Sequence, residues 1–253
     1  NTYSMIGILR TAYISLKKLI EQVLDKRNAN NRPKFKKIVD QFSSITIDTS
    51  NYLSELCLLG EKYGTDKSVY NKKDKHQHSY TPIYNILFNH LKNDKINIAE
   101  LGVAHSASLK MFREYFKNAN IDVFDNDIEA IEKSKDMHLN NVNYFTLDVE
   151  NKENIKNLFE KNNILYDIII DDTSHLFEHQ INIIQETNKF LKKNGILIIE
   201  DIFIGKKNYS EKLYYEHLKH LKNKFSEIFF CTCKHKYNYS GFWNNGKLLI
   251  FKK

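Results

Sequence analysis

The chain has 253 residues, of which 42% are hydrophobic and 27% are charged, and it contains only 2 Pro. Such a composition excludes an intrinsically disordered chain and is sufficient for one sizeable hydrophobic core. The net charge of +7 is compatible with an acidic partner, such as a nucleic acid, an anionic lipid surface or a phosphorylated substrate. Because the lysines are spread along the whole chain, a general compositional bias is favoured over a dedicated nucleic-acid surface.

The N-terminal region is predicted to be helical. Apolar side chains recur at helical spacing over residues 3–26, and the opposite face is basic. We expect this helix to pack on the main domain or on a second subunit, and a membrane-surface helix is the alternative. A loop is predicted over residues 28–33 and a second short helix over residues 34–45. Residues 1–57 are therefore predicted to form a helical segment that serves in packing, in dimerisation or as a linker.

From about residue 96 onward, short apolar runs alternate with helical segments. The predicted strands are residues 96–101, 121–124, 142–147, 166–170, 195–200, 226–233 and 247–253. The predicted helices are residues 108–116, 128–135, 153–161, 177–191 and 211–221. This alternation indicates βαβ units and a parallel sheet.

The last two predicted strands have no helix between them, so we expect them to form an antiparallel pair. Residues 166–170 are apolar on both faces, as expected for a strand that helices cover on each side of a sheet. The predicted fold class is therefore α/β: a doubly wound, mostly parallel, seven-stranded sheet with an antiparallel C-terminal edge, plus the N-terminal helices.

Cysteine usage and hydropathy indicate where the protein resides. Cys57, Cys231 and Cys233 lack the number and spacing of a disulfide scaffold or a metal site, which predicts a reducing, cytoplasmic compartment. No apolar run approaches the ~20 residues of a membrane span, and no signal-peptide pattern is present. The chain begins with Asn1 rather than Met, so we expect residues to precede it in the full-length protein.

Acidic residues follow the first five predicted strands, at the edge of the sheet where ligands of such folds bind. These residues are Glu100, Asp125, Asp148, Asp171 and Glu200. Asp and Asn also begin turns and cap helices, which would explain one or two of them. Five such positions in a row favour a binding site.

The first three strands are predicted to form a nucleoside pocket. Small residues between Gly102 and Ser108 lead into a helix N-terminus, where backbone N–H groups can face a ligand. Asp125 follows the second strand, a position from which a carboxylate can accept hydrogen bonds from both ribose hydroxyls.

The next two strands end in a second acidic group. Its members are Asp171, Asp172, Glu200 and Asp201. Four clustered carboxylates repel one another, so a bound cation is expected, and oxygen ligands favour Mg²⁺, Mn²⁺ or Ca²⁺ over Zn²⁺. His175 is placed to take a proton from a metal-bound alcohol, or alternatively to cap a helix together with Ser174.

Three segments of the chain resemble the class I S-adenosylmethionine-dependent methyltransferases. They are residues 96–127, residues 166–180 with their "DDTSH", and residues 194–202 with their "IIED". The upstream "KYGTDKS" and "HSYTPIYNILF" narrow the resemblance to metal-dependent sugar O-methyltransferases of the mycinamicin type and their polysaccharide-modifying relatives. The resemblance covers residues 58–253, which we take as a Rossmann-like methyltransferase domain.

The resemblance implies roles for residues around the cofactor. Glu100, Gly102, Ala104 and Ser108 would hold the methionine part of S-adenosylmethionine. Asp125 would hold the ribose, and Asp148 would lie near the adenine. The loop containing Thr65 and Lys67 would close over the cofactor, although Thr65 could simply cap a turn.

The resemblance also implies a metal and an acceptor site. Asp171, Glu200 and Asp201 would bind Mg²⁺ or Mn²⁺, and Asp172 would be a further ligand or a support. His175 would act as the general base. The side chains expected to contact the substrate are His78, Tyr80 and Tyr84. The chain departs from the resemblance at Ala104, Ser106 and Ala107, where the group usually has glycines that permit positive φ.

We therefore predict a Mg²⁺-dependent O-methyltransferase that acts on a sugar hydroxyl of a glycan or a glycosylated small molecule. The alternatives are a nucleic-acid methyltransferase, favoured by the +7 charge, and a catalytically inactive binding or assembly module, favoured by the missing glycines. A nicotinamide-dependent oxidoreductase is disfavoured because the chain lacks its glycine fingerprint.

Overall fold

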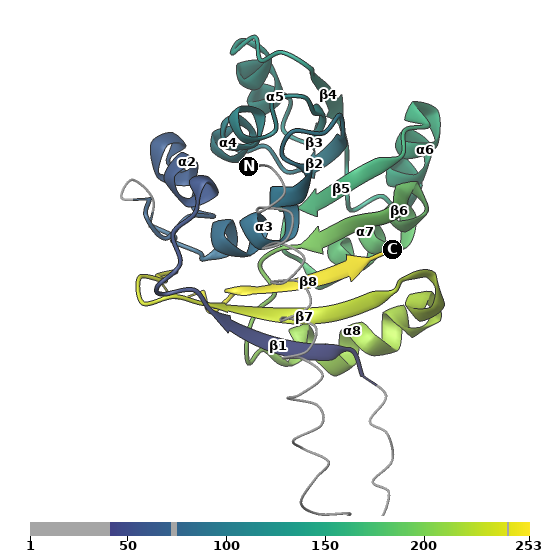
Figure 1. Ribbon diagram of the computed structural model, residues 1–253. Coiled ribbons are helices and arrows are strands. Elements are labelled where there is room, and N and C mark those ends of the chain that lie inside the picture. The colour runs from purple at the N-terminus through teal and green to yellow at the C-terminus, as the bar shows by residue number, and fades with distance from the viewer. Residues whose placement is uncertain (1–40, 72–74, 242) are drawn as a thin grey trace, which may run out of the picture. The chain divides into compact units, whose positions relative to one another are not determined.

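The computed structural model of the chain describes residues 41–71, 75–241 and 243–253 (Figure 1). The described residues belong to one compact unit, Gln41–Lys253. The predicted helix over residues 3–26 and most of the one over residues 34–45 lie outside the described residues, so their role in packing or dimerisation stays a prediction.

A single eight-stranded sheet forms the centre of the described unit (Figure 1). Its strands are β1 (Ser43–Asp48), β2 (Asn97–Leu101), β3 (Asn120–Asp125), β4 (Val142–Thr146), β5 (Tyr166–Asp171), β6 (Leu191–Ile199), β7 (Glu227–Lys234) and β8 (Lys247–Lys252). Their order across the sheet is β1-β7-β8-β6-β5-β2-β3-β4. Only β8 runs antiparallel to its neighbours, β6 and β7, among these described strands. The predicted doubly wound, mostly parallel sheet with an antiparallel C-terminal pair is confirmed.

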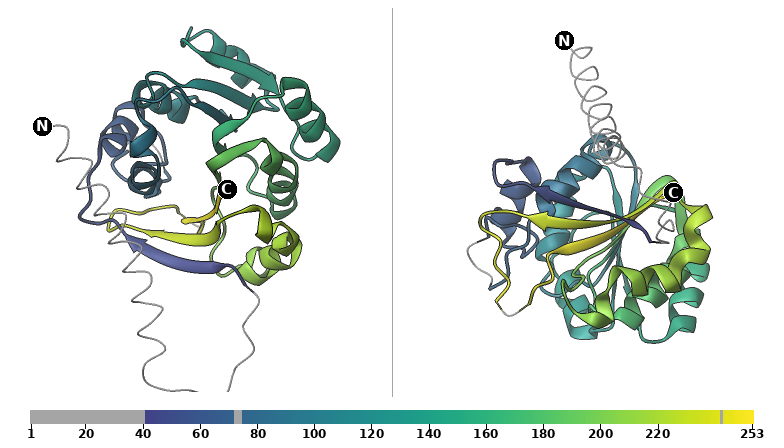
Figure 2. Two further views of the ribbon diagram at one scale, coloured as in Figure 1. Left: turned by 45° about the vertical axis from the view of Figure 1, so that its right-hand side comes forward. Right: turned by 90° about the horizontal axis from the view of Figure 1, so that it is seen from below.

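Helices cover both faces of the sheet (Figure 2). They are α2 (Glu55–Tyr63), α3 (Tyr80–Phe88), α4 (Ala107–Tyr115), α5 (Ile128–Lys135), α6 (Lys152–Asn162), α7 (Phe177–Thr187) and α8 (Glu211–Leu218). Short 3₁₀ turns are η1 (Asn89–Leu91), η2 (Asn188–Phe190), η3 (Lys207–Tyr209) and η4 (Lys219–Lys224). Helices α2, α3 and α4 bury their apolar sides in one core, and α6, α7 and α8 in the other. This layering explains why β5 is apolar on both faces.

Local sequence signals set several helix boundaries. The side chain of Asp127 accepts hydrogen bonds from the backbone N–H groups of Glu129 and Ala130 at the start of α5. Asn151 and Ser210 cap α6 and α8 in the same way. Such capping satisfies N–H groups that have no partner inside the helix, so a polar residue before an apolar stripe predicts the start well.

The strand β1 differs from the prediction of a short helix that ends at residue 45. Ser43–Asp48 instead pairs in parallel with β7, which places β1 rather than the C-terminal pair at the edge of the sheet. The β-branched residues Ile45, Thr46 and Ile47 favour this pairing. The predicted domain boundary at residue 57 falls inside α2, so residues 41–57 contribute β1 and the first turn of α2 to the described unit.

No helix in the described part of the chain is long and apolar enough to cross a membrane.

Candidate active site

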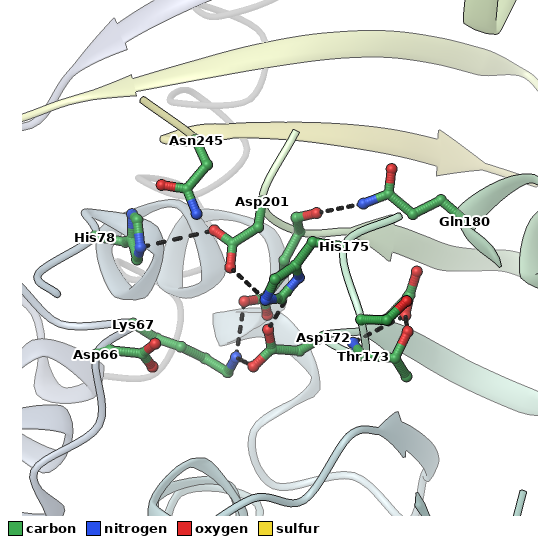
Figure 3. A network of polar contacts seen from close by, with 12 residues as sticks. Asp66, Lys67, His78, Asp172, Thr173, His175, Gln180, Asp201 and Asn245 are labelled. Carbon is green, nitrogen blue, oxygen red and sulfur yellow. Dashed lines mark hydrogen bonds and ion pairs between the residues drawn. The ribbon is translucent and has the colours of Figure 1, made fainter. Parts of the chain in front are cut away.

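The candidate site lies where three neighbouring strands, β2, β5 and β6, end side by side. Leu101 of β2 is in register with Asp171 of β5, and Asp171 is in register with Ile199 of β6. The residues that follow these strands therefore reach the same edge of the sheet. They include Asp172, Glu200 and Asp201, whose carboxylates lie close to Lys67 and His78 from the part of the chain before β2 (Figure 3).

Lys67 joins two of these carboxylates. Its ammonium group donates hydrogen bonds to Asp172 Oδ2 and, at 2.7 Å, to Glu200 Oε2. Burial by itself would lower the pKa of Lys67, but the carboxylates of Asp172 and Glu200 raise it well above its ordinary value. Burial raises the pKa of Glu200, and the Lys67 ammonium opposes that rise. Lys67 therefore stays charged and forms a buried salt bridge with Glu200.

Asp201 and His175 form the second half of the cluster. Asp201 Oδ2 lies 3.4 Å from His175 Nε2, and Asp172 Oδ1 lies 4.0 Å from His175 Nδ1. Ligand atoms of these three residues lie within 4.8 Å of one another, which is compact enough to hold a metal ion. Asp201 and His175 both adopt positive φ, at 57° and 58°. Strained backbone of this kind persists where the surroundings enforce it, as at active sites.

Two tyrosines on α3 reach the acidic cluster because residues four apart share one face of a helix. The Tyr80 hydroxyl donates to Asp201 Oδ1 at 2.6 Å, and the Tyr84 hydroxyl donates to Glu200 Oε1. Burial and the adjacent carboxylates raise the pKa of both tyrosines well above the ordinary value, so both remain protonated donors. His78 stacks on Tyr80 at 4.9 Å and lies 3.7 Å from Asp201 Oδ1. The three residues predicted to contact substrate therefore contact the cluster itself.

Asp171 faces away from the cluster, although it is adjacent to Asp172 in sequence. Successive side chains along a strand point to opposite faces, and Asp171 is the last residue of β5. Its Oδ1 accepts hydrogen bonds from the hydroxyl and the N–H group of Thr173, at 2.7 and 3.2 Å. Its Oδ2 is buried with no hydrogen-bond partner among the described residues, and burial raises the pKa of Asp171 to about 6.

The turn after β2 lies against the cluster. Gly102 has φ of +93°, and a Cβ atom on it would lie 2.1 Å from the Asp172 carbonyl oxygen. Glu100 is buried, and neither carboxylate oxygen accepts a hydrogen bond of normal geometry from the described residues. Burial raises the pKa of Glu100 to about 7, although the Lys67 ammonium and the Ser108 hydroxyl lower it. A buried, unpartnered carboxyl beside a turn of this shape is suited to meeting a cationic group of a ligand.

Three other residues predicted to bind the cofactor, Asp125, Asp148 and Thr65, differ in their contacts. Asp125 ends β3, and its Oδ2 accepts the Val103 N–H at 2.7 Å, which ties it to the turn after β2. Asp148 is exposed and accepts the Glu150 N–H, as a residue beginning a turn does. The buried Thr65 hydroxyl accepts the Lys67 N–H at 3.4 Å.

Two further residues support the site without having been predicted. Gln180 of α7 donates to the Glu200 carbonyl at 3.0 Å and accepts a hydrogen bond from Tyr214, so it fixes the backbone beside Asp201. The sequence signal was a polar residue beside the apolar stripe of α7. The Asn245 carbonyl accepts the Tyr80 hydroxyl at 2.9 Å, and this contact has no local sequence signal because 165 positions separate the two residues.

No protein-family model and no curated protein matches the sequence. Among solved structures, the chain is similar to the MycE methyltransferase from the mycinamycin biosynthetic pathway in complex with Mg and SAH, with 18% identity and a TM-score of 0.58 over 79% of this chain and 55% of that one. The MycE complex that also contains mycinamycin VI gives the same values. An rRNA methylase from Streptococcus thermophilus has 12% identity and a TM-score of 0.48, over 68% of this chain and 95% of that one.

The chain spans about half the length of the MycE chain that it matches. The similarity covers 79% of this chain, which has the mostly parallel, helix-covered sheet described above. This chain therefore has the Rossmann-like fold of the class I S-adenosylmethionine-dependent methyltransferases.

Proposed function

We propose that the chain is an S-adenosylmethionine-dependent O-methyltransferase that requires a divalent cation and acts on a sugar hydroxyl. The observation that carries this proposal is the convergence of Asp172, His175 and Asp201 within 4.8 Å, at the edge of the sheet where ligands of this fold class bind. The MycE structures, which contain Mg and SAH, support the choice of cation and methyl donor.

The charges and donor atoms of the cluster fit a divalent cation. Asp172 and Glu200 pair with the Lys67 ammonium, while Asp201 lies beside His175. The three carboxylates and the one ammonium group leave two negative charges when all four groups are ionised. Carboxylate oxygens are the ligands that Mg²⁺ and Mn²⁺ prefer. Asp172 and Asp201 would hold the ion directly, with Glu200 beside them. Asp171 is not expected to bind the metal ion, because its carboxylate accepts a hydrogen bond from Thr173.

The residues of the chain can perform the proton transfer that O-methylation needs. A divalent cation, when bound, lowers the pKa of a coordinated hydroxyl. His175 Nε2 lies 3.4 Å from Asp201 Oδ2, beside the proposed metal ligands. It can therefore act as a general base and take the proton from the sugar hydroxyl. When bound, S-adenosylmethionine would supply the methyl group: the acceptor oxygen would bond to the methyl carbon as the carbon–sulfur bond breaks, which would leave S-adenosylhomocysteine. Tyr80 and Tyr84 keep Asp201 and Glu200 in place throughout, because both hydroxyls stay protonated.

The turn after β2 supports binding of the methyl donor. Glu100 offers a buried carboxyl to the ammonium group of the methionine part, and the first turn of α4 has backbone N–H groups that the Ser106 side chain does not cap. Ala104 and Ser106 adopt positive φ, at 39° and 58°, although they are not glycines. The turn therefore keeps the backbone shape that glycine would permit, which favours a functional donor site over an inactive module.

Calorimetric titration with S-adenosylhomocysteine, with and without Mg²⁺, tests this proposal. We expect the wild type to show a heat of binding for S-adenosylhomocysteine and for Mg²⁺. The heat of Mg²⁺ binding should disappear in Asp172→Asn. Asp171→Asn is the matched comparison, and we expect it to retain the Mg²⁺ heat because its side chain bonds to Thr173 instead.

Each other outcome has a defined meaning for the proposal. No heat from S-adenosylhomocysteine under any condition would show an inactive binding module. Binding of the methyl donor without any Mg²⁺ effect would remove the metal-dependent mechanism. Steeply salt-dependent binding of RNA, together with no sugar methylation, would favour a nucleic-acid methyltransferase instead.

A further inference from the structure

A cavity of about 500 Å³ adjoins the acidic cluster. It lies between the segment before α3, the residue Ile204 after β6, and the β7–β8 loop. Backbone hydrogen bonds hold these walls together. Gln77 and Tyr239 bond to each other in both directions, at 2.6 and 3.0 Å, and the Ile204 N–H donates to the Asn244 carbonyl at 2.6 Å. The cavity is therefore a built feature of the fold.

The lining of the cavity is nearly uncharged and combines apolar surface with neutral polar side chains. Side-chain amides and hydroxyls come from Gln77, Asn238, Ser240 and Asn244, among others. Lys234 is the one lysine among the described lining residues, and they include no carboxylate. Binding of a nucleic-acid backbone depends on several cationic contacts to phosphates, which this lining does not supply. Neutral hydrogen-bonding groups instead suit a ligand with many hydroxyls.

An exposed tryptophan completes the lining. Trp243 is 49% exposed, although its ring packs near Phe203 at 5.8 Å and His76 at 5.7 Å. Aromatic rings combine a broad apolar face with low conformational entropy, so an exposed ring in a cavity is suited to contact a ligand. A pyranose ring has the complementary form, with an apolar C–H face and hydroxyls around its edge. The exposed Tyr239 adds a second ring on the same loop.

The cavity connects directly to the proposed catalytic residues. The Trp243 ring centroid lies 6.4 Å from that of His175, in an edge-on arrangement. His78 lines the cavity and lies 3.7 Å from Asp201 Oδ1 (Figure 3). A sugar ring stacked on Trp243 would thus direct an edge hydroxyl toward His175 and Asp201.

We propose that the Trp243 cavity is the acceptor subsite and that it binds a neutral sugar ring by stacking on the indole. The inference rests on the proposed function for its role in catalysis, but sugar binding itself requires neither methyl donor nor metal. It assigns acceptor recognition to the β7–β8 loop and to His78, which lines the same cavity.

The composition of the chain permits a direct test, because Trp243 is its single tryptophan. Tryptophan fluorescence of the full chain is titrated with the methyl glycosides of glucose, galactose, N-acetylglucosamine and rhamnose, with and without S-adenosylhomocysteine and Mg²⁺. Oligouridylate serves as the nucleic-acid probe. We expect a saturable change with at least one glycoside. No saturable change with any glycoside in either condition, or a change with oligouridylate alone, would overturn the inference.

Calorimetry on variants then locates the binding. We expect Trp243→Ala to weaken glycoside binding about tenfold and Trp243→Phe to weaken it less, because the smaller ring still stacks. Tyr237→Ala is the control, since Tyr237 is an exposed aromatic of the same loop that packs near Tyr70 and His235. Equal affinity in Trp243→Ala and the wild type, with both folded by circular dichroism, would contradict stacking at this residue.

The same measurements separate this inference from the proposed function. Glycoside binding without any heat from S-adenosylhomocysteine would keep the sugar subsite and reject the methyltransferase. Heat from S-adenosylhomocysteine and Mg²⁺ without glycoside binding would keep the enzyme and reject the subsite.

Discussion

Lys67 Nζ lies 2.7 Å from Glu200 Oε2, although 133 positions separate the two residues in the chain. The same ammonium group donates to Asp172, so one lysine neutralises part of a buried acidic cluster from the loop before α3. This bridge also connects the loop to the ends of β5 and β6. It determines how much negative charge is left for a metal ion.

Replacing Lys67 by Met should lower the stability of the metal-free protein and increase the stabilisation that a metal ion gives. The substitution leaves the buried Glu200 and the half-buried Asp172 without their cation, so we expect the free energy of unfolding to fall by about 3–5 kcal/mol without metal. Mg²⁺ or Mn²⁺ should then raise the melting temperature more in Lys67→Met than in the wild type, because the ion replaces the lost charge. Lys62→Met is the control, since Lys62 pairs with Glu114 at the surface, and its melting temperature should stay near that of the wild type. Equal melting temperatures for Lys67→Met and the wild type would rule out the bridge.

The raised pKa of Glu100 should make folding stability depend on pH. Burial raises the pKa of Glu100 to about 7 in the folded state, from 4.5. The folded state therefore holds a proton that the unfolded state has lost, and its contribution to stability falls as pH rises from about 4.5 to about 7. Glu100→Gln removes this titration. In urea unfolding we expect the two proteins to match at pH 4.5 and the variant to be more stable by about 3 kcal/mol at pH 8. A stability difference that does not change with pH would contradict the assignment.

Gly102→Ala should disrupt the contact between the ends of β2 and β5. A Cβ atom at this position would lie 2.1 Å from the Asp172 carbonyl oxygen, in addition to the strain of φ at +93°. Gly205→Ala is the matched control, because Gly205 has φ of +82° but nothing within 4 Å of its added Cβ. We expect chemical denaturation to give a loss of about 1–2 kcal/mol for Gly205→Ala and a clearly larger loss for Gly102→Ala. Equal losses would mean that the turn after β2 can move away from Asp172.

Tyr84→Phe should show the importance of the hydroxyl that donates to Glu200. The substitution keeps the ring but leaves Glu200 Oε1 buried without its donor, which costs about 1–3 kcal/mol. Tyr115→Phe is the comparison, because its hydroxyl donates only to the amide oxygens of Asn85 and Asn89, at 3.1 and 3.3 Å, and not to a carboxylate. Thermal unfolding of both variants should rank Tyr84→Phe as the less stable. The reverse order would show that Glu200 has another donor.

Local patterns predicted most of the sheet and its helices. The predicted helix over residues 128–135 coincides with α5, whose boundary Asp127 fixes through its capping hydrogen bonds. Strand β1 was missed because its pairing partner, β7, lies more than 180 positions away, and no local period encodes such a partner. Pairing between distant strands is decided by the assembled sheet, not by propensity within one segment.

The sequence alone determined which strand ends carry carboxylates and that His175 follows one of them, because alternation and turn chemistry are properties of neighbouring residues. Only the tertiary structure decided that Asp172 joins the cluster while Asp171 turns to Thr173, and that Lys67 serves as an internal cation. It also brought Trp243 beside His175, 68 positions earlier in the chain. Charge compensation and ring contacts depend on distances in space, and those distances exist only once the sheet has brought the ends of its strands together.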